Sequence, residues 1–391
     1  MFVQLLLFIA GFLLFIGLIL VHEWGHFIVA RRNGVEIEEF GLGIPPRAWR
    51  KKLKSGLILS LNWLPLGGFV KLKGENDSDS RPGSFGAASL WVKTKIMLAG
   101  VTMNFIAGIL LLTIVALIGM PKLIDNQFSI KSDTKIVSNQ VIVSYIEPDS
   151  PADKAGLSGR DIIKSLSVGN QTMPVHNIQD LLNAASTSAG QTINLEIKHN
   201  GKEIIKEIKL KDKTEVAASL KTDKPKGYLG VGPSELQVYR ATWSAPIVAL
   251  GFTKQLIGLT FQGLGQALSG LGSIIAGLVT SNEQAKSNGS EKATSQVAGP
   301  VAIMAVLWGG GYLGFNFVLM VIAIISLTLA LMNILPIPAL DGGRLLMAFL
   351  SRGILRRPLS KSSEEWIVGA SMVMLLTLFI LITFVDVKRF F

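Results

Sequence analysis

The stretch Val21-His22-Glu23-Trp24-Gly25-His26-Phe27 closes the first apolar run of the chain, which covers residues 3–21. Residues four apart lie on one face of a helix, so the imidazoles of His22 and His26 can reach a common point. Two histidines at this spacing, followed by Glu23 as a candidate general base, are typical of a zinc-binding helix. Histidines that only cap a helix at a membrane interface are the structural alternative. Charged groups are costly at the end of a membrane-length segment, which favours a functional site.

The composition is that of a polytopic membrane protein. Of the 391 residues, 49% are hydrophobic, and several apolar runs approach 20 residues. The net charge of +11 comes from basic residues beside these runs, which indicates anionic lipid rather than nucleic acid as the partner. The absence of cysteine excludes disulfides, thiolate ligands and a cysteine nucleophile. Because the N-terminus lacks a basic region and a small-residue cleavage site, we expect a retained transmembrane helix.

We expect four transmembrane helices, at residues 3–21, 96–119, 313–335 and 367–385. Basic residues follow the first segment directly, so the positive-inside rule places its C-terminal end in the cytoplasm. Asn104, inside the second segment, is expected to bond a neighbouring helix. Residues 245–280 carry one apolar stripe among polar side chains and glycines, which favours an amphipathic helix in the membrane interface. Residues 281–296 are predicted to be a polar linker.

Two regions between the expected spans have β-type patterns. Residues 35–73 alternate in polarity around Gly-containing turns and carry a basic cluster, which predicts a small sheet on the cytoplasmic side. This sheet is either an amphipathic element on the membrane surface or an exposed edge that receives an extended substrate near the metal. Residues 122–232 are polar and long enough for one further domain. Within it, residues 147–163 resemble the signature of a PDZ domain, and we expect that domain outside the cytoplasm.

The number of crossings tests the metal site independently. The third span ends in Asn333-Ile334-Leu335-Pro336-Ile337-Pro338-Ala339-Leu340-Asp341-Gly342-Gly343, where prolines break the helix at a depth that only buried or cavity-lining backbone tolerates. With the N-terminus outside, the first and third spans both end inside, so His22, His26 and Asp341 fall at one depth. Asp341 then completes the three protein ligands of a catalytic zinc. A further crossing at residues 245–280 would instead put Asp341 about 30 Å away.

These motifs resemble the site-2 protease family, in particular its bacterial branch of the regulator of sigma-E protease type. The resemblance covers nearly the whole chain, with Val101 where a proline is common, and is carried by His22–His26, Gly67–Lys71, Ala99–Asn104 and Asn333–Gly343. It implies a polytopic α-helical membrane protein of about four transmembrane helices, with a membrane-reentrant β-hairpin at residues 35–73 and one extracytoplasmic PDZ-like α+β domain. The expected divisions are residues 1–121, 122–232, 233–298 and 299–391.

The resemblance also implies an activity, which we expect to be zinc-dependent intramembrane proteolysis in the bacterial inner membrane. The expected substrates are single-span membrane proteins, either anti-sigma factors or remnant signal peptides, cut in regulated intramembrane proteolysis. The active site would lie towards the cytoplasm, and the chain would act as a monomer in contact with membrane lipid. The expected roles are Zn²⁺ binding by His22, His26 and Asp341, catalysis by Glu23, and substrate binding by Asn333, Gly67, Gly68 and Phe69.

Two other functions compete with this hypothesis. A membrane-anchored PDZ scaffold with a degenerate metal site would keep its function without zinc but lose it without residues 140–215. A transporter would use the intramembrane histidines and aspartate as an ion path. Four expected spans and no visible inverted repeat disfavour the transporter.

Overall fold

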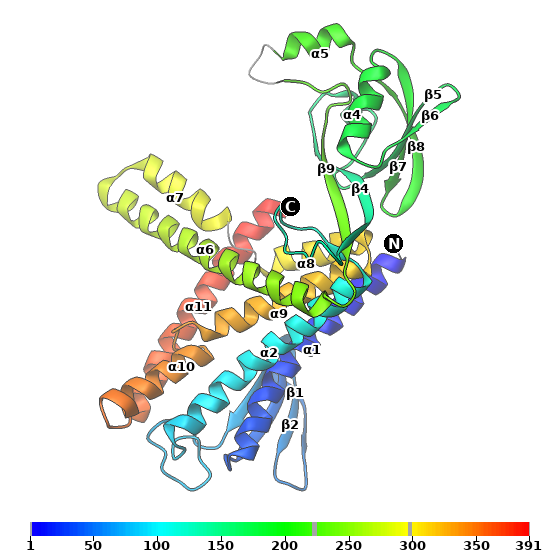
Figure 1. The fold of residues 1–391 in the computed structure, drawn as a ribbon. Helices are drawn as coiled ribbons and strands as arrows, with labels where there is room; N and C mark the ends of the chain where they lie inside the picture. Colours follow the sequence, from blue (N-terminus) through cyan, green and yellow to red (C-terminus); the bar gives the residue numbers. More distant parts are fainter. Residues whose placement is uncertain (1, 221–224, 296–298, 391) are drawn as a thin grey trace. The chain divides into compact units, whose positions relative to one another are not determined.

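The chain forms two compact units in the computed structural model, which describes residues 2–220, 225–295 and 299–390. One unit consists of residues 116–245, and the other combines residues 2–115 with residues 246–390. Figure 1 shows the first as a sheet with short helices and the second as a set of long helices with a β-hairpin. The metal-binding motifs all belong to the helical unit.

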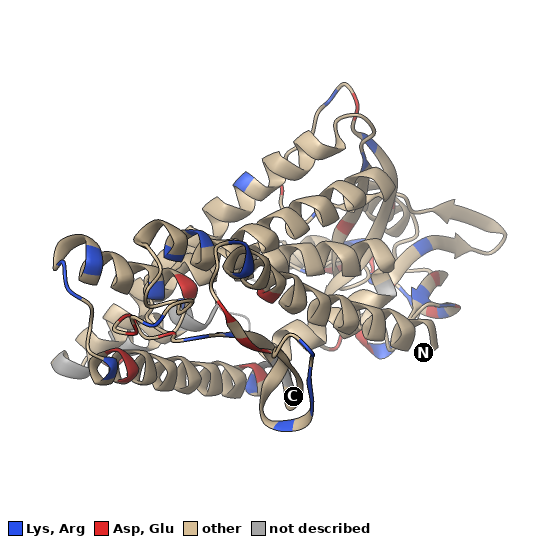
Figure 2. Cartoon of the chain, turned by 90° about the horizontal axis from the view of Figure 1, so that it is seen from below, with Lys and Arg blue, Asp and Glu red and all other residues tan. Residues whose placement is uncertain are grey.

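The helical unit is built from apolar helices. Their bounds are α1 Phe2–Arg32, α2 Leu90–Ile118, α6 Ala245–Thr280, α7 Glu283–Ser295, α8 Pro300–Gly310, α9 Phe315–Ile334, α10 Asp341–Ala348 and α11 Lys361–Phe390, with a 3₁₀ turn at Gly311–Leu313 and a π-helix, η2, at Phe349–Ile354. Within the described residues, α1, α2, α6, α9 and α11 are long and apolar enough to cross a membrane. Figure 2 shows few charged residues along these helices, with most at helix ends and in loops. The chain is therefore a multi-pass membrane protein.

The region 245–296 differs from the sequence-based expectation. Four spans were predicted because the polar stripe of residues 245–280 favoured the interface, but α6 satisfies the length and hydropathy of a fifth span. Its predicted interfacial position stays a prediction. The segment predicted as a linker contains helix α7, which runs back along α6 (Figure 1). A Cβ at Gly289 of α7 would lie 2.7 Å from the Gly270 carbonyl oxygen of α6, so the missing side chain allows this close packing.

The hairpin beside α1 is a sheet of four segments formed by β1 (Ile37–Lys52) and β2 (Ile58–Leu72). Residues 37–42 of β1 pair with residues 68–72 on one side, and residues 39–42 pair with residues 58–61 on the other. Residues 47–52 pair with the far side of residues 58–62. The two outer edges of this sheet are therefore residues 68–72 and residues 47–52. The first edge continues towards the metal-binding motif, as described below.

The other unit contains an antiparallel sheet of seven strands in the order β3-β9-β4-β5-β7-β8, with β6 paired to β5. Its elements are β3 Met120–Pro121, β4 Lys135–Ile146, α3 Pro151–Lys154, β5 Ile162–Val168, β6 Gln171–Pro174, α4 Ile178–Thr187, β7 Thr192–His199, β8 Lys202–Lys209, α5 Lys213–Ser219 and β9 Val231–Arg240. The buried face of α4, with Leu181 and Ala184, joins a core formed by strand residues such as Val141, Leu166 and Leu195. Residues 122–232, predicted as a PDZ-like domain, lie within this unit.

A carboxylate anchors the loop before β4 to the end of this unit. Asp133 accepts hydrogen bonds from the backbone N–H groups of Thr242 and Ser244, at 2.7 and 3.0 Å, and from the hydroxyls of both residues. The hydrogen bonds from Ser244 and Thr242 hold the pKa of Asp133 below its usual range. A carboxyl whose pKa is lower in the folded state stabilises the fold above its unfolded pKa, and this contribution fades as the pH falls.

We therefore expect Asp133→Asn to lower the unfolding temperature of the detergent-solubilised chain at pH 7, and this deficit to shrink as the pH falls below about 4. Asparagine keeps the shape of the side chain, but it lacks the negative charge that strengthens these hydrogen bonds. Thermal unfolding of both chains between pH 7 and pH 3 measures the effect. A deficit that stays constant over this range would contradict the assignment.

Candidate metal centre

Three predicted ligands meet at one point of the helical unit. His22 and His26 lie one turn apart on α1, are 9% and 7% exposed, and place their Nε2 atoms 3.1 Å apart. Asp341 is the first residue of α10, and its Oδ2 atom lies 3.2 Å from each Nε2. These three residues form a group of the kind that holds a metal ion. The structure thus brings together residues that are more than 300 positions apart.

The residues fit a zinc ion. A tetrahedral zinc with bonds of about 2.1 Å separates its ligand atoms by about 3.4 Å, close to the separations in this cluster. The Oδ2 atom of Asp341 is buried, and within the described part of the chain it makes no hydrogen bond of acceptable geometry. Leaving a buried acceptor unpaired is costly, so this atom is suited to a cation. Two imidazoles and one carboxylate are also the ligand set of a catalytic zinc with an open position.

Groups on α2 hold the histidines in the correct tautomer. The carbonyl oxygen of Ile96 lies 2.7 Å from Nδ1 of His26, so Nδ1 carries the proton and Nε2 is free for a metal. The Asn104 amide lies 3.2 Å from Nδ1 of His22, while its Oδ1 atom is buried and unpaired. Because amide oxygen and nitrogen have nearly the same shape, turning the amide over places Oδ1 as the acceptor for Nδ1–H. Both histidines then present Nε2 to the metal.

The prediction that Asn104 bonds a neighbouring helix is confirmed, and one of its partners is a candidate metal ligand. Its side chain orients His22 on α1, and its backbone carbonyl accepts from the Ser326 hydroxyl on α9 at 2.9 Å. The signal available in the sequence was the presence of one amide in an apolar span. That signal does not show whether the partner on the other helix is a metal ligand.

Glycines let α1 and α2 approach each other closely beside the two histidines. A Cβ on Gly100 of α2 would lie 2.4 Å from Nε2 of His26 and 2.7 Å from Nε2 of His22. On the facing helix, a Cβ on Gly25 would lie 2.7 Å from the carbonyl oxygen of Ala99. All three distances are too short for a real side chain, so the metal site depends on these two glycines.

We expect Gly100→Ala to weaken zinc binding by about 10–100-fold, the range found when groups that support metal ligands are altered. The added methyl group would displace the imidazoles from their converging positions. Gly17→Ala is the matched control, because a Cβ on Gly17 of α1 has no atom within 4 Å. Competition with a zinc chelator measures both affinities, and equal affinities would contradict the assignment.

The turn between α9 and α10 fixes the position of Asp341. A Cβ on Gly342 would lie 2.1 Å from the Ile334 carbonyl oxygen, and one on Gly343 would lie 2.0 Å from that of Ile337. The two glycines therefore let α10 begin directly against the proline-containing turn. Asn333 lies half-buried in the last turn of α9, and its predicted contact with substrate stays a prediction.

The hairpin edge 68–72 reaches the candidate general base. A Cβ on Gly68 would lie 3.0 Å from Cγ of Glu23, and Val70 also approaches the Glu23 carboxylate. The two other predicted substrate residues have local roles in the sheet. Gly67 occupies a turn with a φ of 119°, and the Phe69 ring covers Gly41. The edge, rather than these side chains, is what lies beside Glu23.

A buried ionic cluster fixes the loop that follows the hairpin. Asp77 contacts the Lys93 ammonium and accepts from Ser351 Oγ at 2.9 Å and from Arg352 Nε at 3.1 Å. Burial acts to raise the pKa of Asp77, but these partners hold it below its usual range. The Glu364 carboxylate on α11 accepts from the Asp77 backbone N–H at 2.7 Å. These contacts join α2, η2 and α11 and could not be read from the sequence, because they connect distant segments.

Comparison with known proteins agrees with the geometry. The model of Peptidase family M50 matches residues 10–378. A protein of Clostridium perfringens, named as an inferred zinc metalloprotease, is 28% identical over 97% of this chain and 98% of its own length. A protein of Clostridium acetobutylicum with the same kind of name is 29% identical over 95% of this chain and 94% of its own. A third such protein, from Campylobacter jejuni, is 28% identical over 98% of this chain and 93% of its own length.

Proposed function

The chain belongs to peptidase family M50, a family of zinc-dependent metalloproteases, and on this premise we propose that it cleaves peptide bonds within transmembrane segments of single-span membrane proteins. The observation that carries this proposal is the position of the His22, His26 and Asp341 cluster. It lies among helices long and apolar enough to cross a membrane, where a soluble substrate has no access.

Residues around the cluster supply the steps of peptide hydrolysis. Zinc, when bound, acts as a Lewis acid that activates water and polarises the scissile carbonyl. Glu23 is adjacent in sequence to His22 and takes the proton of the attacking water, then returns it to the leaving amine. Asn333 is the proposed donor that holds the substrate backbone near the metal.

The substrate must become extended, because a helix hides its peptide bonds. Lys73 donates its N–H inward to the Glu36 carbonyl, so the alternate residues Gly68, Val70 and Leu72 present their N–H groups on the outer edge of β2. A substrate strand that pairs with this edge would pass directly beside Glu23. This proximity supports the substrate-binding interpretation of the hairpin over that of a surface element.

We expect Val70→Pro to lower kcat/KM about tenfold. Proline has no N–H, so this variant loses one hydrogen bond from the edge of β2 to the substrate. Proline is tolerated at an edge position whose N–H takes no part in the hydrogen bonds of the sheet. Val70→Ala keeps the N–H and is the matched control. Equal rates for the two variants in a reporter assay would show that substrate does not pair at Val70.

We place the chain in a bacterial inner membrane, with the metal centre towards the cytoplasm and the sheet unit outside as a PDZ-like filter or docking module. Anti-sigma factors or remnant signal peptides are the proposed substrates, and the active form is a monomer in contact with lipid.

The purified chain, incubated in vesicles with a tagged single-span reporter, tests the proposed function. We expect fragments cut within the transmembrane segment, loss of cutting with a chelator, and recovery on adding zinc. Cutting confined to the soluble parts of the reporter would overturn the intramembrane assignment. A biological function that survives removal of zinc would favour the scaffold instead.

A further inference from the structure

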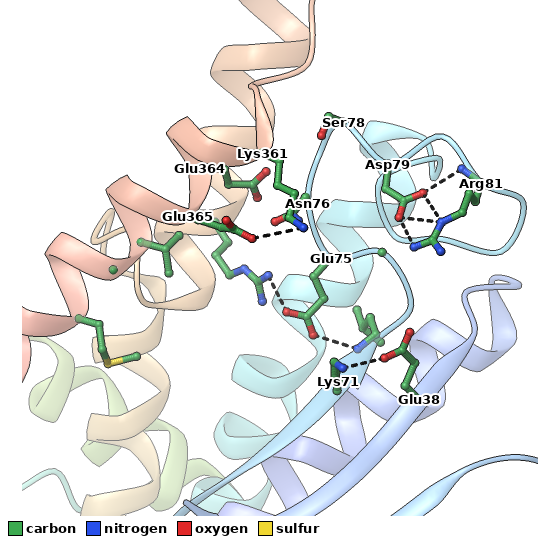
Figure 3. Close-up of a pocket in the computed structure, with 16 residues that line it drawn as sticks. Glu38, Lys71, Glu75, Asn76, Ser78, Asp79, Arg81, Lys361, Glu364 and Glu365 are labelled. Carbon is green, nitrogen blue, oxygen red and sulfur yellow. Dashed lines mark hydrogen bonds and ion pairs between the residues drawn. The ribbon is translucent and has the colours of Figure 1, made fainter. Parts of the chain in front are cut away.

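A polar cavity of about 750 Å³ opens beside the end of the hairpin. Its walls come from four segments, namely Glu38 on β1, the end of β2 with the loop to Arg81, Arg344 on α10, and the first turns of α11 up to Met372 (Figure 3). It is separate from the zinc ligands, and nothing in the proposed chemistry uses it.

The outer edge of β2 leads from Glu23 into this cavity. Gly68 and Val70 lie against Glu23, and Leu72, two residues further along the same edge, lines the cavity. The Leu72 N–H donates to Glu75 Oε1 at 2.9 Å, so this N–H is not available to a paired substrate strand. A strand paired with β2 must therefore leave the sheet where the cavity begins.

Helix α10 connects the same two places. Asp341 and Arg344 lie three residues apart on α10, so they share a face and are separated by about 4.5 Å along the axis. Arg344 donates to Glu75 Oε2 at 3.1 Å and thereby joins the cavity wall of α10 to that of the hairpin loop. The cavity is thus one helical turn from the zinc ligand.

The lining fits a polypeptide better than a small ion. Five acidic and four basic side chains line the cavity, and they are Glu38, Glu75, Asp79, Glu364, Glu365, Lys71, Arg81, Arg344 and Lys361. Their near-balance gives no strong attraction for a single anion or cation. The side chains of Lys71, Arg81 and Lys361 are 56%, 66% and 68% exposed despite their ion pairs, so they can exchange partners with a polar peptide.

We propose that this cavity is a subsite for the polar segment that flanks the cleaved transmembrane bond of the substrate. The inference rests on the proposed function. Gly68 and Leu72 are four residues apart, about 13 Å along a strand, so substrate residues about four to six positions from the scissile bond occupy the cavity. The hydrophobic part of the substrate stays at the edge of β2, while its polar flank is held by the charged lining.

Crosslinking tests this placement, because the chain has no cysteine of its own. Glu365→Cys places a thiol in the cavity wall, and Trp366→Cys, at a neighbouring side chain that is 74% exposed and does not line the cavity, is the control. Both are made in a Glu23→Gln chain so that substrate is not consumed. Single-cysteine reporters scan ten positions on each side of the scissile bond under mild oxidation.

We expect Glu365→Cys to crosslink reporters with cysteine four to six residues from the bond at least fivefold more than Trp366→Cys does. Equal yields at the two positions, or no crosslink at Glu365→Cys, would overturn the subsite. The wild-type chain is assayed for cleavage of the same reporters. Absence of cleavage despite selective crosslinking would overturn the proposed function alone, whereas cleavage without selective crosslinking would overturn the subsite alone.

Reversing the charge of Glu365 tests the subsite through the cleavage rate. Glu365→Lys is expected to change the ratio of kcat/KM between reporters with lysine and with glutamate at these flanking positions by about fivefold. A reporter with alanine at these positions gives the reference rate for each chain. A ratio that does not move, in a variant that remains active, would contradict the subsite.

Discussion

Replacing Glu23 by glutamine is expected to lower kcat/KM by about 10²–10⁴-fold while zinc remains bound, because a glutamine cannot accept the proton of the attacking water. The carboxylate follows His22 directly in α1 and is not among the three atoms that form the metal cluster. Its loss should therefore affect the chemical step more than substrate binding, so the change should appear mainly in kcat.

Measurements on purified protein separate this effect from misfolding. Zinc content and unfolding temperature should match those of the wild type, while cleavage of the reporter is lost. Glu36→Gln is the matched control, because this glutamate is 63% exposed and forms an ion pair with Lys73. Full activity of the Glu23→Gln chain would rule out Glu23 as the general base.

The metal cluster was predictable from the sequence because the histidines and the aspartate each lie in a short motif that can be recognised by itself. The spacing of His22 and His26 on a helix and the proline-interrupted end of α9 are both visible without tertiary information. The count of crossings then placed Asp341 at the depth of the histidines. The structure has these three side chains in one cluster, although α6 is itself long enough to be counted as a span.

The support around the cluster was not predictable in the same way. The Ile96 carbonyl and Asn104 face the histidines only because α1 and α2 pack at Gly25 and Gly100. A sequence pattern gives the face of a helix but not the rotation and height at which another helix meets it. The ionic cluster around Asp77 depends on such packing between three segments, and so does the cavity proposed here as a subsite.

Removing the carboxylate of Asp341 is expected to have the second large effect, on zinc binding itself. Altering a group that only supports a ligand costs about 10–100-fold in affinity, so Asp341→Ala should lose more than about 100-fold. The two imidazoles would remain as an incomplete site. The cleavage rate should therefore fall together with the fraction of chains that hold zinc. Metal analysis after dialysis against a buffered zinc concentration measures the loss, and reporter cleavage is followed in parallel.

Asp79→Ala is the control for this experiment, because Asp79 is an aspartate of the same unit whose carboxylate pairs with Arg81 in the exposed loop after the hairpin. It should retain zinc as the wild type does. Addition of excess zinc should partly restore cleavage to Asp341→Ala but not to Glu23→Gln, because the first variant lacks a ligand and the second lacks a base. If Asp341→Ala instead bound zinc normally, the third ligand would lie elsewhere. The meeting of α1 and α10 would then be a packing contact without a role in catalysis.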